Sequence, residues 1–262
     1  MPSFGVVAEG ITDQRVIENI LQGYLGNEDD EPVVNYVQPP LDKTGSHGVA
    51  YGGWGLVFDF LRRGEYRNAL QTNDFLVLQI DTDVSQQVGY DVPWREGGRE
   101  LTPADLVARV VQKLESLIDE EFYRKHAARF VFAVAVDGIE CWLLPLLYNN
   151  NKAEKTTGCL EAANHELKLK NRKPLKHGEH KDPRAYDEAS RAYAKRATLM
   201  KQRSRNPSLD LFIEDLAKKT VAAAVPPENP AEPSASKAAG ATPAEQPTSE
   251  HSEESGVAPS EE

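Results

Sequence analysis

Short apolar runs alternate with amphipathic stretches along most of the chain. Four runs made mainly of apolar residues predict β-strands, at residues 3–8, 33–37, 75–80 and 129–136. Apolar residues spaced three and four apart predict helices between and after these strands, at residues 13–25, 54–69, 103–126, 141–148, 183–203 and 207–219. The chain is therefore expected to form strands and helices in alternation.

Alternating strands and helices are typical of an α/β domain. We expect a mostly parallel, Rossmann-like sheet with helices on both faces, followed by a helical C-terminal segment. The runs at 75–80 and 129–136 are nearly all apolar, which favours parallel strands buried on both faces. The length of 262 residues allows one or two domains, and the pattern favours a single domain over residues 1–222, whose C-terminal part, about 165–222, is basic and helical.

Residues 223–262 differ in composition from the rest of the chain. They contain eight Glu, one Lys, seven prolines and no aromatic residue. Such a segment cannot bury enough apolar surface to offset the entropy that is lost on ordering. We therefore predict a disordered acidic tail after the folded domain.

The net charge changes sign along the chain. The total of −11 argues against a simple basic nucleic-acid coat and against binding to an anionic membrane surface. Residues 1–164 carry −11, whereas residues 165–206 carry +8. An acidic cluster can hold divalent cations and a basic strip can hold phosphates, although a solvated surface is the commoner reason for a run of charge.

Localisation signals and cysteine content favour the cytoplasm. The N-terminus lacks a basic region followed by an apolar core, and the longest apolar runs are too short to span a bilayer. Only two cysteines, Cys141 and Cys159, are present, which excludes a disulfide framework and favours a reducing compartment. Because Cys141 has no evident His or Asn partner, we do not expect a thiol nucleophile.

Carboxylates follow three predicted strands at the points where the strands end. Glu9 follows the first, Asp81 and Asp83 follow the third, and Glu140 lies shortly after the fourth. Ligands of open α/β sheets bind outside the carboxyl ends of the strands, so parallel neighbours would bring these acids together. A divalent cation such as Mg²⁺, which prefers oxygen ligands, would supply the counter-charge that they need. Singly, such acids are more often capping or turn residues, and Asp137 could be an ordinary turn.

Four motifs narrow the interpretation. They are Glu9-Gly10-x-x-Asp13, Asp81-x-Asp83, Glu140-x-Trp142-Leu-Leu and Asn206-Pro207-Ser208. In this order, over roughly residues 3–217, they resemble the TOPRIM catalytic domain, and in particular the RloB-like and OLD-nuclease-like TOPRIM proteins associated with phage defence. Residues 10–80 are long for a minimal TOPRIM unit, so the resemblance also implies an inserted strand, loop and helix.

The resemblance implies a Mg²⁺- or Mn²⁺-dependent nuclease that hydrolyses phosphodiester bonds. Glu9, Asp81 and Asp83 would be metal ligands, and Glu9 could also act as the general base. Asp13 would be a supporting ligand, and Glu140 a further ligand or an organiser, so that all five are candidate catalytic residues. Hydrolysis is favoured over strand passage or priming because the chain lacks the size and the additional modules for either.

Basic side chains of the 165–206 segment are expected to bind the DNA or RNA substrate. The candidates are Lys181, Arg184, Lys201, Arg203 and Arg205. The family context also implies antiphage or mobile-element defence and a protein partner from a defence operon, such as an ATPase. The alternative is a non-catalytic TOPRIM-like partner or sensor subunit of a defence complex.

Three further features leave alternatives open. The glycine-rich residues 43–55 could cradle a phosphate or form a substrate-contact loop. His177 and His180 could bind a transition metal, but an exposed loop is the commoner role for such a pair. Tyr186 and Tyr193 could stack on bases, although packing against the domain is the expected role.

Overall fold

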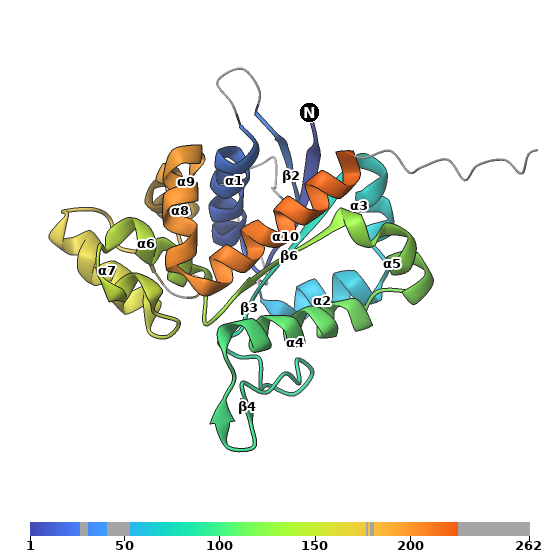
Figure 1. Cartoon of the computed structure of the whole chain (residues 1–262), viewed down its shortest axis with the longest axis horizontal. Helices are drawn as coiled ribbons and strands as arrows, with labels where there is room; N and C mark the ends of the chain where they lie inside the picture. The colour runs from blue at the N-terminus through green and yellow to red at the C-terminus, as the bar shows by residue number, and fades with distance from the viewer. Residues whose placement is uncertain (27–30, 41–52, 177, 179–180, 225–262) are drawn as a thin grey trace, which may run out of the picture. The chain divides into compact units, whose positions relative to one another are not determined.

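The computed structural model describes residues 1–26, 31–40, 53–176, 178 and 181–224, and residues Met1–Pro226 form one compact unit. A parallel four-stranded sheet with the order β2-β1-β3-β6 lies at its centre (Figure 1). Its strands are β1 Ser3–Val7, β2 Val33–Gln38, β3 Phe75–Asp81 and β6 Phe130–Ala135. The predicted α/β class with a parallel sheet flanked by helices is confirmed.

Helices pack on both faces of the sheet (Figure 1). The α-helices are α1 Ile11–Leu25, α2 Trp54–Arg62, α3 Tyr66–Thr72, α4 Pro103–Ser116, α5 Glu120–His126, α6 Leu144–Leu147, α7 Cys159–Leu169, α8 Pro183–Ser190, α9 Arg196–Gln202 and α10 Pro207–Ala224. Short 3₁₀ turns are η1 Ala127–Arg129, η2 Ile139–Leu143, η3 Asn151–Glu154, η5 Arg191–Ala194 and η6 Arg203–Arg205. Strands β4 Arg95–Glu96 and β5 Arg99–Glu100 form a separate hairpin.

Each face of the sheet has its own hydrophobic core. Because successive side chains of a strand point to opposite faces, Val77 of β3 packs with α1 and α6 to α10, whereas Leu78 packs with α2 to α5. The whole of β3 is buried, as the nearly continuous apolar run at 75–80 predicts. Burial on both faces fixes β3, and with it the acidic residues at its end, rigidly within the domain.

Helix α10 protects the edge strand β6. The Asp215 carboxylate accepts the N–H of Phe132 at 3.0 Å, and the Ser208 hydroxyl accepts the N–H of Val136 at 3.3 Å. These N–H groups would otherwise be unpaired donors at the open edge of the sheet. The C-terminal helix therefore completes the sheet and fixes the chain just before Asp137.

Several predicted boundaries differ from the structure. The helix predicted at 54–69 is divided into α2 and α3 at Gly64, whose φ of 71° lies in the left-handed region. The helix predicted at 103–126 is divided where Asp119 caps α5 by accepting the N–H of Phe122 at 2.8 Å. The segment 183–203 forms α8, η5 and α9 rather than one helix.

Helix α7 and the β4–β5 hairpin were not predicted. The buried face of α7 includes the small Ala163 between Leu160 and Leu167, which weakens the apolar periodicity. In the other direction, α10 continues past the predicted end at residue 219 to Ala224. Residues 225–262, which hold nearly all of the predicted tail, lie outside the described part of the chain. Within that part, no helix combines the length and apolar character that crossing a membrane requires.

Candidate functional site

Four carboxylates meet at the carboxyl edge of the sheet. Strands β1, β3 and β6 are parallel neighbours, so Glu9, Asp81 and Glu140 follow them at the same edge. Asp13 joins them from the first turn of α1, which begins directly after Gly10. The side chains of Asp13, Asp81 and Glu140 are buried, and Asp13 retains only 1% exposure.

Backbone contacts hold these acids close together. One carboxylate oxygen of Glu9 accepts the N–H of Asp81 at 2.7 Å and so joins the ends of β1 and β3. A Cβ atom on Gly138 would lie 2.8 Å from Oε2 of Glu140 and 3.4 Å from Oδ2 of Asp81. The absence of a side chain at Gly138 therefore makes the space in which these two carboxylates face each other.

Burial and mutual repulsion raise the proton affinity of the cluster. Burial is the main reason that the pKa of Glu9 is raised to about 8. The hydrogen bond from the N–H of Asp81 lowers this pKa, whereas the charges of Asp13 and Asp83 raise it. Burial likewise raises the pKa of Asp13 to about 6 and that of Asp81 well above its usual range. Buried carboxylates with raised pKa values are typical of functional sites, because such a site needs a cation or a proton for its charge.

Two buried polar residues that sequence reasoning missed support the cluster. The side-chain amide of Gln79 accepts the N–H of Glu9 at 3.1 Å and donates to Asp81 at 2.8 Å. The hydroxyl of Tyr90 donates to the main-chain carbonyl of Asp81 at 2.9 Å. Gln79 is detectable in principle, because it is the one polar residue within the apolar run before Asp81. Tyr90 lies in a loop and carries no such signal.

An ammonium group and a hydroxyl group reach the cluster from the basic segment 165–206. Lys181, directly before the N-cap of α8, places its Nζ 3.7 Å from Oε1 of Glu140. Tyr186, fully buried on α8, donates its hydroxyl to the same carboxylate. Burial and Glu140 raise the pKa of Tyr186, so the hydroxyl keeps its proton and acts as a donor. Tyr186 thus packs in the core, as expected, and in addition donates a hydrogen bond to an acid of the cluster.

Helix α8 is held in this position by α1. The side-chain amide of Asn19 on α1 donates to the hydroxyl of Ser190 on α8 at 2.8 Å, and both residues are buried. Tyr193 of η5 is also fully buried and donates its hydroxyl to the carbonyl of Trp142. The expectation that Tyr193 packs against the domain is confirmed.

Asp83 and Asp137 lie at the rim of the cluster. Asp83 is exposed, and its N–H donates to the carbonyl of Asp137 at 2.9 Å. Asp137 has a φ of 67°, and its N–H donates to the hydroxyl of Thr82 at 2.9 Å. Partial desolvation raises the pKa of both carboxylates. Asp137 is thus a turn residue whose backbone also joins the chain after β6 to the chain after β3.

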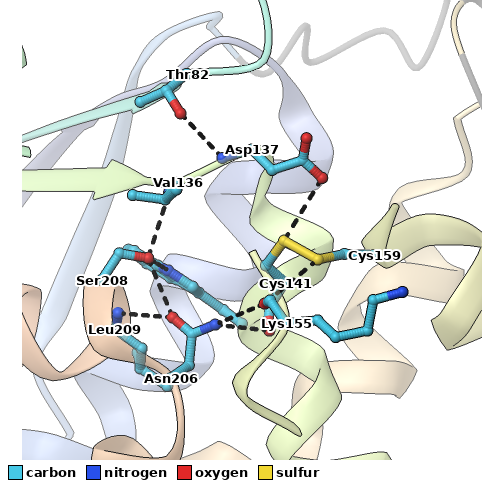
Figure 2. The surroundings of a disulfide bond; sticks show 10 residues. Thr82, Val136, Asp137, Cys141, Lys155, Cys159, Asn206, Ser208 and Leu209 are labelled. Carbon is cyan, nitrogen blue, oxygen red and sulfur yellow. Dashed lines mark hydrogen bonds between the residues drawn. A yellow bond between two sulfur atoms is a disulfide. The ribbon is translucent and has the colours of Figure 1, made fainter. Parts of the chain in front are cut away.

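Two of the motifs singled out in the sequence contact each other (Figure 2). The Ser208 hydroxyl accepts the indole N–H of Trp142 at 2.8 Å and donates to the Asn206 side chain at 3.1 Å. The Asn206 amide in turn donates to the carbonyl of Cys141 at 3.3 Å. The segment 206–208 therefore supports η2, the turn that presents Glu140 to the cluster.

Cys141 and Cys159 form a disulfide, which corrects the expectation drawn from the cysteine count (Figure 2). It ties η2 to the first residue of α7, 18 positions along the chain. The two sulfur atoms and a carboxylate oxygen of Asp137 lie within 4.8 Å of one another, but bonded sulfurs are not thiolate ligands. The spacing of the two cysteines in the sequence does not predict this bond, because their pairing depends on where α7 packs.

The basic residues predicted to bind substrate separate into three groups. Lys181 is part of the cluster, whereas Arg184 and Lys201 are exposed. Arg203 pairs with acids of α10, and Arg205 donates to carbonyls of the α6 region, at 3.1 and 3.3 Å. The last two guanidinium groups are therefore engaged within the domain rather than free for phosphate.

Other predicted features fall outside the described residues. These are His177, His180 and the greater part of the glycine-rich segment, residues 43–52. Gly53 is described: its N–H donates to the carbonyl of Glu9 at 2.8 Å. The end of the glycine-rich segment thus adjoins the first residue of the cluster.

The donor chemistry of the cluster suits a hard divalent cation, although no three carboxylates of its described residues have oxygens all within 4.8 Å of one another, so they would have to draw closer to share an ion. Glu9, Asp81 and Asp83 offer only carboxylate oxygens, which suit Mg²⁺ or Mn²⁺ better than softer metals. Glu9 and Asp81 each use one oxygen in a hydrogen bond to the β3 segment, and each has a second oxygen for a ligand.

Comparison with family models, curated proteins and solved structures finds no match to this chain. The resemblance to TOPRIM proteins therefore stays a prediction from the four motifs. The geometry of the cluster stands independently of it.

Proposed function

We propose that this protein is a Mg²⁺-dependent nuclease that hydrolyses phosphodiester bonds. The proposal is supported mainly by the buried acids that meet at the carboxyl ends of three parallel strands. Burial, and after it the repulsion between neighbouring acids, raises the pKa of these carboxylates, as expected where a metal ion is to bind. The proposal that this activity serves antiphage or mobile-element defence rests on the motif resemblance alone, and the proposed cytoplasmic location rests on the N-terminal sequence and the short apolar runs.

Glu9, Asp81 and Asp83 would hold the ion, which supplies Lewis-acid activation of the phosphate and of a bound water. Glu9 would also accept a proton from the attacking water, the role that the motif resemblance implies. The ammonium group of Lys181 would offset the negative charge that builds on the phosphate. Glu140 and Tyr186 position that ammonium group at the edge of the site.

The test is cleavage of plasmid DNA, single-stranded DNA and RNA with Mg²⁺, Mn²⁺ or EDTA. Glu9→Gln and Asp81→Asn should reduce cleavage at least about 100-fold, because each removes a charged ligand. Glu121→Gln is the matched control, since Glu121 lies on α5 at the opposite, amino end of β6 and pairs only with Lys125 among the described residues. Equal activity of all four proteins would overturn the proposal.

A non-catalytic role as a sensor or partner subunit is favoured by one observation. Lys181 and Tyr186 already satisfy part of the acidic cluster without a metal ion. If calorimetry shows no Mg²⁺ or Mn²⁺ binding, and a complex with a protein such as an operon-encoded ATPase is isolated, this second function replaces the first.

A further inference from the structure

Lys181 is a positively charged group built into the acidic cluster. Its side chain is about one-third exposed, and its Nζ faces Glu140 at 3.7 Å and the ring of Tyr186 at 5.7 Å from the ring centre. Burial lowers the pKa of Lys181, but Asp13, Glu140, Asp81 and Glu9 raise it by more. The ammonium group therefore stays charged, and it interacts most strongly with Asp13 and Glu140.

The cluster divides into a satisfied half and an open half. Oε1 of Glu140 accepts from Tyr186 and faces Lys181, while Asp13 accepts from the hydroxyl of Thr12 at 3.5 Å and interacts with the same ammonium group. The positive charge of Lys181 therefore offsets part of the negative charge of Asp13 and Glu140 at that half.

At the other half, no basic side chain of the described residues forms an ion pair with Glu9, Asp81 or Asp83, whereas Glu140 pairs with Lys181. Glu9 and Asp81 each have one carboxylate oxygen to which no side chain of the described residues donates. Asp83 beside them is exposed and likewise receives no side-chain donor within the described ranges. A diffusible cation is therefore expected at Glu9, Asp81 and Asp83 and not at Asp13 and Glu140.

We propose that Lys181 permanently occupies the place of the second metal ion, so that the site binds one divalent cation. This inference rests on the proposed function. In two-metal nucleases the ions lie about 3.5–4 Å apart and clamp the attacking and leaving oxygens. Here a tethered ammonium group would stabilise one of these oxygens, and its charge would disfavour a second ion beside it. Unlike a metal ion, it cannot be removed by a chelator.

The test is a Mn²⁺ titration of the full-length protein, followed by electron paramagnetic resonance. The wild type should bind one ion and give the hyperfine sextet of an isolated Mn²⁺. Lys181→Met should bind two ions, whose short separation broadens the spectrum by exchange coupling. Lys181→Arg, which keeps the charge, should bind one. Lys173→Met is the matched control and should also bind one, because Lys173 pairs with Asp182 at the exposed surface.

The outcomes separate the two proposals. Two ions in the wild type, or one ion in a folded Lys181→Met protein, would overturn the inference and leave the proposed function standing. No ion in any protein would overturn both. If circular dichroism shows that Lys181→Met does not fold, the wild-type and Lys181→Arg stoichiometries decide, and one isolated ion in each supports the inference.

Discussion

The hydroxyl of Tyr186 donates a hydrogen bond to the carboxylate of Glu140, 46 positions away in the sequence. This bond links α8, in the basic C-terminal segment, to the turn after β6. It joins the two regions of opposite charge at the one place where the sheet presents buried carboxylates.

Removing this hydroxyl should weaken both the fold and the site. Tyr186→Phe should lower the free energy of unfolding by about 2 kcal/mol, since hydrogen bonds to charged groups contribute about 1.5–3 kcal/mol. It should also weaken Mn²⁺ binding about 10-fold, because Glu140 and Lys181 lose their common support. Denaturant titration and calorimetry measure the two effects.

Tyr193→Phe is the matched control for this experiment. Tyr193 is equally buried and donates to a main-chain carbonyl rather than to a site acid. It should lower stability while leaving Mn²⁺ affinity unchanged. If the two variants bind Mn²⁺ alike, Tyr186 has no role at the site beyond packing.

The Asp81 carboxylate is expected to destabilise the folded protein in the absence of a metal ion. Burial raises its pKa, so its ionised form is disfavoured in the folded protein, and Asp81→Asn should raise the melting temperature at pH 8 in EDTA. The N-terminal end of the same strand offers the opposite case. The pKa of Asp74 is lowered because the N–H and hydroxyl of Ser3 donate to it, so Asp74→Asn should lower the melting temperature. Melting temperatures that shift in the same direction would contradict this account.

Metal-free protein should lose stability as the pH rises. The folded-state pKa of Glu9 is about 8 against an ordinary 4.5, and that of Asp13 is about 6 against 3.8. The folded protein therefore holds more protons than the unfolded chain between these values, and stability falls from about pH 4 to pH 8. Saturating Mn²⁺ should reverse the trend above pH 6, because it binds the ionised forms. Thermal unfolding over this range, with EDTA or with Mn²⁺, measures the effect, and a melting temperature that rises with pH in EDTA would refute it.

The disulfide should stabilise the fold and be detectable directly. Cys141→Ser should lower the free energy of unfolding by about 3 kcal/mol, the value expected for closing a loop of this length. Cys159→Ser and the double variant should lose the same amount, since each breaks the same bond. Mass spectrometry of unreduced peptides tests the pairing, and finding both residues as free thiols in the purified protein would refute it.

The positions of the strands, and of the acids that follow them, could be predicted from the sequence. Runs such as 75–80 are apolar because β3 is buried on both faces, so their location does not depend on distant contacts. Glu9 and Asp81 follow from this, as the residues that end such strands. The breaks in the predicted helices at Gly64 and Asp119 were harder to predict from the sequence, because a single turn residue decides whether one helix or two are formed.

The partners of the acids could not be predicted in the same way. Gln79 contacts Glu9 and Tyr186 contacts Glu140 across 70 and 46 positions of the sequence, and Tyr90 reaches Asp81 from a loop; local periodicity encodes none of these contacts. The cysteine pairing was missed for the same reason, since Cys159 reaches Cys141 only through the packing of α7.

The sequence alone determined an α/β domain with acids at three strand ends and a basic segment after them. Only the tertiary structure decided that one base of that segment, Lys181, enters the acidic cluster while Arg203 and Arg205 are bound elsewhere in the domain. The physical reason is that apolar periodicity records which face of each element is buried. The pairing of charges depends on which buried faces meet, and here α8 packs on α1 beside the carboxyl edge of the sheet.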